Sequence, residues 1–245
     1  MLQSHEGKRV PQVEFRVRAN GDWKNVTTDD LFKNKKVVVF SLPGAYTPTC
    51  SSTHLPRFEE LAPTLCANGV DAIYCISVND TFVMNEWAKE EGLEHVQVIP
   101  DGNGEFTAGM DMLVDKADLG FGKRSWRYSM LVDDGVVEKM FIEPQKPGDP
   151  FEVSDADTML RYVNPKARTP DQVAVLSKEG CPFCAKAKAL LSDAGYDYVE
   201  LMLPHKTRGR VMGAVAGAQT TPQVFINGKL IGGAEEVEAY LRKAA

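Results

Sequence analysis

The N-terminal part of the chain alternates between short apolar runs and segments in which apolar residues recur at helical spacing. Residues 37–41 are a β-rich run that predicts a strand, and 96–99 predict a short strand. Residues 71–78 form a continuous apolar run, which predicts a strand covered on both faces of a sheet. Apolar residues three and four positions apart predict helices between these strands, over 51–67 and 82–91. The buried face of the first helix is expected to carry Leu55, Phe58, Ala62 and Leu65.

A change of pattern follows. Two apolar runs, 128–132 and 136–142, flank an Asp-Gly turn and predict a β-hairpin, and a short helix is expected over 154–163. Residues 164–170 contain two prolines and two charged residues but no large apolar side chain, which predicts a linker. We therefore expect one domain over 1–163 and a smaller one over 171–245.

The second part of the chain also alternates predicted strands and helices, over a shorter length. Its expected elements are strand 173–177, helix 182–194, strand 196–202, helix 206–216, the hairpin 223–226 and 229–231, and helix 235–241. The buried stripe of the first helix is expected to be Phe183, Ala187, Leu190, Leu191 and Ala194. A parallel crossover followed by an antiparallel hairpin is a thioredoxin-like arrangement. The predicted fold class is α/β, with two thioredoxin-like domains in tandem.

Composition excludes several classes of protein. Hydrophobic residues make up 43% and charged residues 25% of the chain, as in ordinary globular proteins. The net charge of −6 argues against a nucleic-acid partner. No apolar run approaches the ~18 residues of a membrane span, and the first residues lack the pattern of a signal peptide. We therefore expect a cytoplasmic protein with no membrane partner.

The sequence Cys181-Pro-Phe-Cys184 is the first candidate for chemistry. It lies between a predicted strand and a predicted helix, with Pro182 in the first turn. The helix N-terminus and Lys178 both favour a thiolate at Cys181. Cys184 is one turn further along, so we expect Cys181 to be the exposed nucleophile and Cys184 the more buried resolving thiol.

A metal site is the alternative for this cysteine pair. The chain has five cysteines, an odd and sparse set that does not suggest a disulfide scaffold. A structural zinc site needs a second pair of ligands, and no second Cys-x-x-Cys or His-x3–5-His pattern is present. We expect no metal and no bound cofactor, although an iron–sulfur cluster bridging two chains stays open.

Three motifs in this part occur in order and resemble a glutaredoxin: Lys178–Cys184, Thr221–Ile226 and Ile231–Gly233. The resemblance implies glutathione as reducing co-substrate and a cis peptide before Pro222. It implies that the Thr221 backbone pairs with glutathione and that Lys178 meets one of its carboxylates. The remaining glutathione contacts that it implies are Phe183, Gly233, Ala234 and Glu235.

Cys50 is the second candidate. It follows a predicted strand and a loop rich in Pro, Gly and Thr, and it begins a predicted helix. This position is expected to lower the pKa of its thiol, and Thr47 is close enough in sequence to hydrogen-bond the sulfur.

Three segments containing or following this cysteine resemble the peroxiredoxin-5 group of peroxiredoxins: Pro43–Ser51, Asn79–Trp87 and Trp126–Met130. The resemblance implies that Cys50 is the peroxidatic nucleophile and that Thr47 holds a peroxide oxygen. It further implies that Pro43 shields the sulfur and that Arg127 stabilises the thiolate and polarises the O–O bond. Arg124 is a rival for the last role, with a poorer match to the family arginine.

The sequence predicts less specific roles for the other two thiols of the first domain and for His54. Cys66 lies beside the apolar stripe of its helix and Cys75 inside an apolar strand, so both are expected to be small structural hydrophobes. His54 is expected to serve helix packing or an interface rather than act as a base. The first domain then has a nucleophile without a resolving cysteine.

The sequence therefore predicts a glutathione-dependent thiol peroxidase for hydrogen peroxide and organic hydroperoxides such as alkyl hydroperoxides. Cys50 is oxidised to sulfenic acid, condenses with glutathione, and is reduced by Cys181 of the fused domain. A homo-oligomer, dimer or tetramer, is expected. The alternatives are a general thiol–disulfide oxidoreductase that removes glutathione from proteins, and a non-enzymatic iron–sulfur-binding or chaperone-like oligomer.

Overall fold

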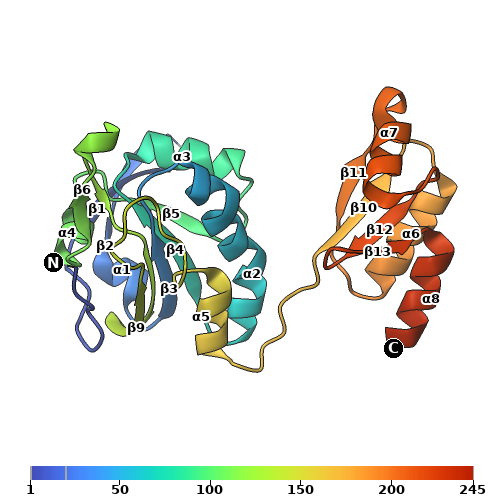
Figure 1. The fold of residues 1–245 in the computed structure, drawn as a ribbon. Helices are drawn as coiled ribbons and strands as arrows, with labels where there is room; N and C mark the ends of the chain where they lie inside the picture. The colour runs from blue at the N-terminus through green and yellow to red at the C-terminus, as the bar shows by residue number, and fades with distance from the viewer. Residues whose placement is uncertain (1, 20, 245) are drawn as a thin grey trace. The chain divides into compact units, whose positions relative to one another are not determined.

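The three strands predicted first are neighbours in a five-stranded sheet of the computed structural model, which describes residues 2–19 and 21–244 (Figure 1). The chain divides into two units, Met1–Thr169 and Pro170–Ala245. The sheet of the first unit has the strand order β5-β4-β3-β8-β9. Its strands are β3 (Lys36–Ser41), β4 (Ala72–Ser77), β5 (Gln97–Pro100), β8 (Tyr128–Asp133) and β9 (Val136–Ile142).

The direction of the strands agrees with the expected fold class. β3, β4 and β5 are parallel, whereas β8 is antiparallel to β3 and to β9. Side chains alternate across β3, so that Val38 and Phe40 enter one core while Val37 and Val39 enter the other. Both faces of the sheet are therefore buried, which explains the continuous apolar runs in the sequence.

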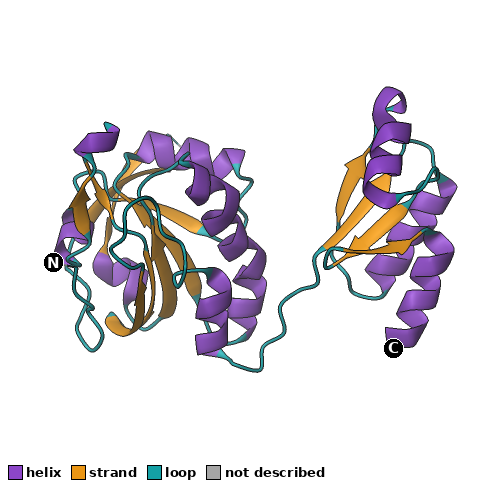
Figure 2. Ribbon diagram, in the orientation of Figure 1, coloured by secondary structure: helices purple, strands orange, loops and turns teal. Residues whose placement is uncertain are grey.

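Helical segments cover the face of the sheet that carries Val38 and Phe40 (Figure 2). They are η1 (Cys50–His54), α2 (Leu55–Ala67), α3 (Thr81–Glu90) and α5 (Ala156–Val163). The four predicted core positions of α2 are all fully buried. Asp80 caps α3 by accepting hydrogen bonds from the backbone N–H groups of Phe82 and Val83, and Asp155 caps α5 in the same way from Thr158.

Several short elements were not predicted from the sequence: β1 (Glu14–Ala19), β2 (Asp22–Thr27), α1 (Thr28–Phe32), α4 (Glu105–Gly109), β6 (Leu113–Asp115), η2 (Ala117–Leu119) and β7 (Lys123–Ser125). The β1–β2 hairpin is largely exposed and polar, and Phe15 is its only side chain in the buried core among the described residues. Such strands carry little of the hydrophobic periodicity on which sequence prediction depends.

The second unit is a four-stranded sheet with the order β11-β10-β12-β13. Its elements are β10 (Val173–Ser177), α6 (Pro182–Asp193), β11 (Val199–Met202), α7 (His205–Ala216), β12 (Gln223–Ile226), β13 (Lys229–Gly232) and α8 (Ala234–Ala244). β10 and β11 are parallel, and β12 is antiparallel to both β10 and β13. This is the predicted thioredoxin-like order, so the fold class is confirmed for both units.

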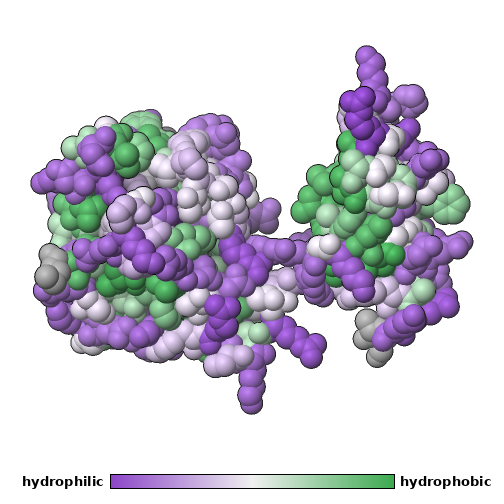
Figure 3. Space-filling view, in the orientation of Figure 1, coloured by the Kyte–Doolittle hydropathy of each residue, from purple (hydrophilic) through white to green (hydrophobic). Residues whose placement is uncertain are grey.

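The predicted buried stripe of α6 needs a correction. Ala187 and Leu191 are buried and Leu190 is partly buried, but Phe183 is 63% exposed and Ala194 is exposed. Phe183 lies in the first turn of the helix, ahead of the turns that pack on the sheet. At the other side of this unit, the edge strand β11 exposes Val199 and Leu201, where the space-filling view is green (Figure 3).

Within the described residues, none of the helices has the length and apolarity needed to cross a membrane.

Candidate functional site

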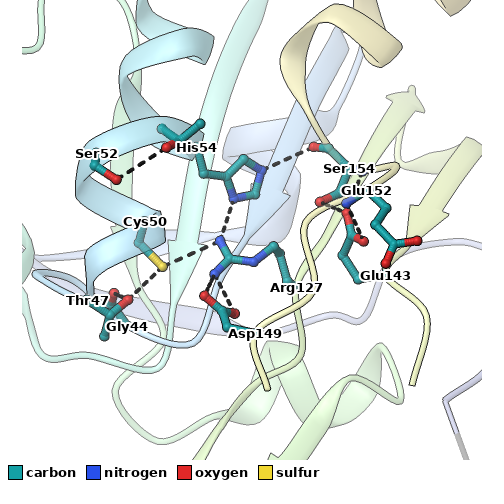
Figure 4. Close-up of polar contacts among 11 residues, drawn as sticks. Gly44, Thr47, Cys50, Ser52, His54, Arg127, Glu143, Asp149, Glu152 and Ser154 are labelled. Atoms are coloured by element: carbon teal, nitrogen blue, oxygen red, sulfur yellow. Dashed lines mark hydrogen bonds and ion pairs between the residues drawn. The ribbon is translucent and has the colours of Figure 1, made fainter. Parts of the chain in front are cut away.

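Cys50 lies where the loop after β3 turns into a helix. The first turn is a π-type turn, in which the backbone N–H of Leu55 donates to the carbonyl of Cys50 before the chain continues as α2. Such turns are frequent at functional sites. The Cys50 residue is fully buried, and its sulfur faces polar groups rather than solvent (Figure 4).

Thr47 supplies one of these groups. Its Oγ1 lies 2.8 Å from Cys50 Sγ and 3.0 Å from the carbonyl oxygen of Gly44. A hydroxyl has one proton to donate. When Cys50 is a thiol, its S–H can donate to Thr47, whose own proton goes to Gly44; when Cys50 is a thiolate, the Thr47 proton must turn to the sulfur.

Arg127 supplies the other polar group that faces the Cys50 sulfur. It immediately precedes β8 and is only 1% exposed. Its Nη1 lies 3.5 Å from Cys50 Sγ, and its Nη2 lies 2.6 Å from both carboxylate oxygens of Asp149. Burial by itself lowers the pKa of Arg127, but the charges of Cys50 and Asp149 outweigh it and raise the pKa of the guanidinium. Arg127 is therefore a buried cation placed between the Cys50 sulfur and the Asp149 carboxylate.

Arg124, the rival arginine, is engaged elsewhere. Its Nε donates to the carbonyl of Phe121 at 2.9 Å, and its Nη1 donates to the carbonyl of Val78. It therefore supports the loops beside the site, while Arg127 is the arginine that contacts Cys50.

His54 is a fully buried member of the same network. Its Nδ1 lies 3.1 Å from Arg127 Nη1, and its Nε2 lies 3.1 Å from the carbonyl oxygen of Ser154. Burial and the neighbouring Arg127 charge lower the pKa of His54 to about 3. The ring is neutral, donates from Nε2 and accepts at Nδ1, so it has no free nitrogen to act as a base. The expectation of helix packing missed this direct contact with Arg127.

A cavity of about 390 Å³ lies beside the loop that leads to Cys50. Pro43 and Thr47 line it on the side of the Cys50 loop, and Gly148 and Asp149 line it on the side of the segment after β9. Leu119 and Phe121 contribute exposed apolar walls. Thr47 is thus in contact with both the cavity and the sulfur.

The two remaining cysteines of this unit differ from each other. Cys75 is fully buried on β4, and burial raises the pKa of its thiol well above the usual range. Cys66, in contrast, is exposed near the end of α2, so its expected role as a buried hydrophobe is wrong. It lies next to Leu65 of the helical stripe, but one position on a helix turns the side chain by about 100°, out of the core.

In the second unit, Cys181 is the N-cap of α6 and forms a disulfide with Cys184. Cys181 is 8% exposed and Cys184 2%, so Cys184 is the more buried of the two as expected, but Cys181 is itself buried rather than exposed. The Thr221–Pro222 peptide is cis, as the resemblance implied. Cys181 Sγ lies 3.7 Å from Thr221 Oγ1 and 3.8 Å from the Thr221 carbonyl oxygen.

A cavity of about 510 Å³ opens beside this disulfide. All seven residues expected to contact glutathione line it: Lys178, Phe183, Thr221, Pro222, Gly233, Ala234 and Glu235. Sequence reasoning missed Arg208, Gln219, Thr220 and Glu236, which also line it and lie outside the recognised motifs. Glu236 Oε2 accepts a hydrogen bond from the backbone N–H of Gly233 at 2.9 Å, so the start of α8 is partly capped by its own chain.

The described residues contain no group of three or more His, Cys, Asp or Glu side chains placed to hold a metal ion.

Comparisons with known proteins assign each unit to a family. The family model described as Redoxin matches residues 5–160, and the model described as Glutaredoxin matches residues 173–231. The hybrid peroxiredoxin hyPrx5 of Haemophilus influenzae is 61% identical over 239 residues, which cover 98% of this chain and 99% of that relative. A peroxiredoxin of Synechocystis is 57% identical over 169 residues, covering 64% of this chain and 89% of the relative.

Solved structures resemble the first unit. Reduced Prx3 of Vibrio vulnificus in complex with hydrogen peroxide is 39% identical with a TM-score of 0.61, covering 64% of this chain and 98% of that one. The Plasmodium falciparum antioxidant protein, a 1-Cys peroxiredoxin, is 35% identical with a TM-score of 0.63, covering 66% and 99%.

Proposed function

Because the chain belongs to the peroxiredoxins, as a redoxin domain followed by a glutaredoxin domain, and is a peroxide-reducing oxidoreductase, we propose that glutathione is its electron donor. The substrates are hydrogen peroxide and organic hydroperoxides. One observation carries the reaction with peroxide: Cys50 Sγ lies within hydrogen-bond distance of both Thr47 Oγ1 and Arg127 Nη1. These donors face the sulfur at the place where a peroxide oxygen must bind and take up negative charge.

The oxidising half of the cycle takes place at Cys50. The thiolate attacks one oxygen of the hydroperoxide, the O–O bond breaks, and the leaving oxygen departs as an alcohol or as water after protonation. Cys50 becomes a sulfenic acid, two electrons having passed from the sulfur to the peroxide. Glutathione then condenses with the sulfenic acid, which releases water and leaves a mixed disulfide on Cys50.

The reducing half takes place at Cys181. Its thiolate attacks the glutathione sulfur of the mixed disulfide, and Cys50 leaves as a thiolate. A second glutathione reduces the glutathionylated Cys181 and departs as glutathione disulfide. The Cys181–Cys184 disulfide is an oxidised form that two glutathione molecules return to the dithiol before this cycle starts. Cys184 has no required step in the monothiol route.

The seven predicted residues that line the cavity beside Cys181 support glutathione as the ligand there. Lys178 and Arg208 offer positive charge to a carboxylate, and the start of α8 offers backbone N–H groups. Glutathione dependence also implies a compartment that keeps glutathione reduced, for which we propose the cytoplasm.

The test is the consumption of hydrogen peroxide by the full chain with glutathione, NADPH and glutathione reductase as the only other components. We expect turnover to be lost in both Cys50→Ser and Cys181→Ser, and to persist in Cys184→Ser. Cys66→Ser is the matched control for removal of a thiol outside both sites. Full turnover in Cys50→Ser would overturn the proposal.

The observed disulfide favours a second candidate, a general thiol–disulfide oxidoreductase in which the first unit serves docking. This alternative predicts that Cys50→Ser leaves reduction of a glutathionylated protein unchanged and that Cys184→Ser impairs reduction of protein disulfides. The same set of variants therefore separates the two functions.

A further inference from the structure

Residues 143–154, which we call the strap, run from the end of β9 to the start of α5 and reach the Cys50 site at three points. Asp149 holds Arg127 Nη2, the Ser154 carbonyl accepts from His54 Nε2, and the Phe151 ring lies 5.5 Å from the Arg127 guanidinium carbon. Neither the sequence motifs nor the proposed cycle gives this segment a role.

A buried carboxylate anchors the strap. Glu143 is 1% exposed, and its two oxygens accept hydrogen bonds from the backbone N–H groups of Glu152, Val153 and Ser154 and from the Ser154 hydroxyl, all at 2.8–2.9 Å. The backbone N–H of Glu143 donates to the carbonyl of Arg127 at 3.1 Å. Both ends of the strap are therefore fixed near Arg127, and Asp149 of the intervening segment contacts the guanidinium (Figure 4).

The nitrogens of Arg127 have different partners. Nη1 faces Cys50 and His54, Nη2 faces both oxygens of Asp149, and Nε has no hydrogen-bond partner within the described residues. Asp149 is 42% exposed at its side chain, whereas Arg127 is buried. The single charge of the guanidinium is thus divided between a buried sulfur and a carboxylate that reaches solvent.

We propose that Asp149 is a positioning residue that competes with Cys50 for the charge of Arg127 and so moderates the reactivity of the Cys50 sulfur. The inference rests on the proposed role of Cys50 as the peroxidatic nucleophile. His54 and Phe151 hold the guanidinium in place independently of Asp149, so removal of the Asp149 charge leaves Arg127 beside the sulfur and more fully available to it.

The groups that act on Arg127 come from three elements. Cys50 and His54 belong to η1, Asp149 to the strap, and Cys75 lies on β4, close enough for the charges of Cys50 and Arg127 to influence its thiol. His54 is neutral and Cys75 is held in its protonated form by burial. Asp149 is therefore the anion that competes with Cys50 at this cation.

The test is the pH dependence of iodoacetamide alkylation of Cys50 in the reduced full chain, followed by mass spectrometry of the peptide that contains it. In Asp149→Asn we expect the midpoint to fall by about one pH unit, because a like charge near the thiolate has been removed. Asp149→Glu, which keeps the charge, should restore the midpoint. Glu152→Gln is the matched control, since Glu152 is on the strap but pairs with Lys146.

An unchanged midpoint in Asp149→Asn would overturn the proposal. A raised midpoint would do so as well, because it would mean that Asp149 only holds Arg127 in place. Arg127 is buried and loses its carboxylate partner in Asp149→Asn, so circular dichroism of this variant and of the charge-retaining Asp149→Glu checks that the fold is intact. Alkylation uses neither peroxide nor glutathione, and failure of the proposed cycle would show instead as turnover that survives Cys50→Ser.

Discussion

A single hydroxyl proton at Thr47 links the ionisation of Cys50 to the geometry of its loop. In the thiol state the proton holds the Gly44 carbonyl, and in the thiolate state it is given to the sulfur. The loop between β3 and η1 therefore exchanges one hydrogen bond for another when the nucleophile is formed. No additional donor has to be brought in when the charge develops.

Replacing Thr47 by valine keeps the volume and removes this donor. We expect the second-order rate constant for Cys50 oxidation by hydrogen peroxide to fall roughly 100-fold, as when one preorganised donor to developing charge is removed. Stopped-flow tryptophan fluorescence or competition with a second peroxidase measures the constant. Thr53→Val, which removes an exposed hydroxyl from the adjoining turn η1, is the control, and an equal loss in both variants would contradict the assignment.

His54 predicts a pH dependence of stability. Its pKa in the folded chain, about 3, lies below the ordinary value of 6.5, so the unfolded chain binds its proton first as the pH falls. The contribution of neutral His54 to the free energy of unfolding is present above pH 6.5 and is lost at lower pH. The free energy of unfolding falls by about 2 kcal/mol between pH 7 and pH 5 for this reason. Urea unfolding at the two pH values, compared with His54→Gln, isolates this loss. An equal pH dependence in the variant would contradict it.

At the scale of elements, the strap is held by one carboxylate. Glu143→Ala leaves the backbone N–H groups of residues 152–154 without their acceptor, and we expect the free energy of unfolding to fall by about 2–4 kcal/mol. The peroxidase rate should fall as well, because Ser154 no longer fixes His54. Glu152→Ala, an exposed carboxylate on the same segment, should change stability by less than about 0.5 kcal/mol.

Elements with strong periodicity were predictable from the sequence, and elements defined by tertiary contacts were not. The sheet strands and α2 bury complete faces, so their patterns are visible in the sequence. The β1–β2 hairpin buries little, and α1 is a five-residue helix fixed by a capping box between Thr27 and Asp30. Neither leaves a periodic signal.

The candidate sites follow the same division. Cys50, Thr47 and Cys181 stand in local motifs at the start of helices, which is why the sequence identifies them. Asp149 reaches Arg127 across 22 positions of chain, and Arg208 reaches the cavity beside Cys181 from α7. No local sequence pattern predicts that Asp149 contacts Arg127 or that Arg208 lines this cavity, because both positions depend on the path of the chain between elements.

At the scale of the molecule, each unit has its own core and its own candidate site. We therefore expect residues 1–169 and 170–245 to fold as separate polypeptides. Mixed at about 10 µM each, they should turn over peroxide with glutathione roughly 100-fold more slowly than the full chain, because fusion gives an effective concentration on the order of millimolar. Circular dichroism of each fragment is the folding control, and equal turnover would show that fusion contributes nothing.

The expected homo-oligomer adds a second test at this scale. Mixing full-length Cys50→Ser with Cys181→Ser restores turnover only if glutathionyl transfer passes from one chain to another. Sedimentation of the same mixtures gives the size of the assembly, and turnover that stays absent in a mixed oligomer would restrict transfer to a single chain.

The exposure of Cys66 has a consequence for counting thiols. Cys50 and Cys75 are buried, and Cys181 is joined to Cys184, so Cys66 is the free thiol open to a bulky reagent in the described part of the folded chain. Ellman's reagent should release one equivalent of chromophore from the native oxidised chain and three after denaturation. Gels run without reductant will also show dimers joined through Cys66, and these crosslinks report storage in air rather than the biological assembly.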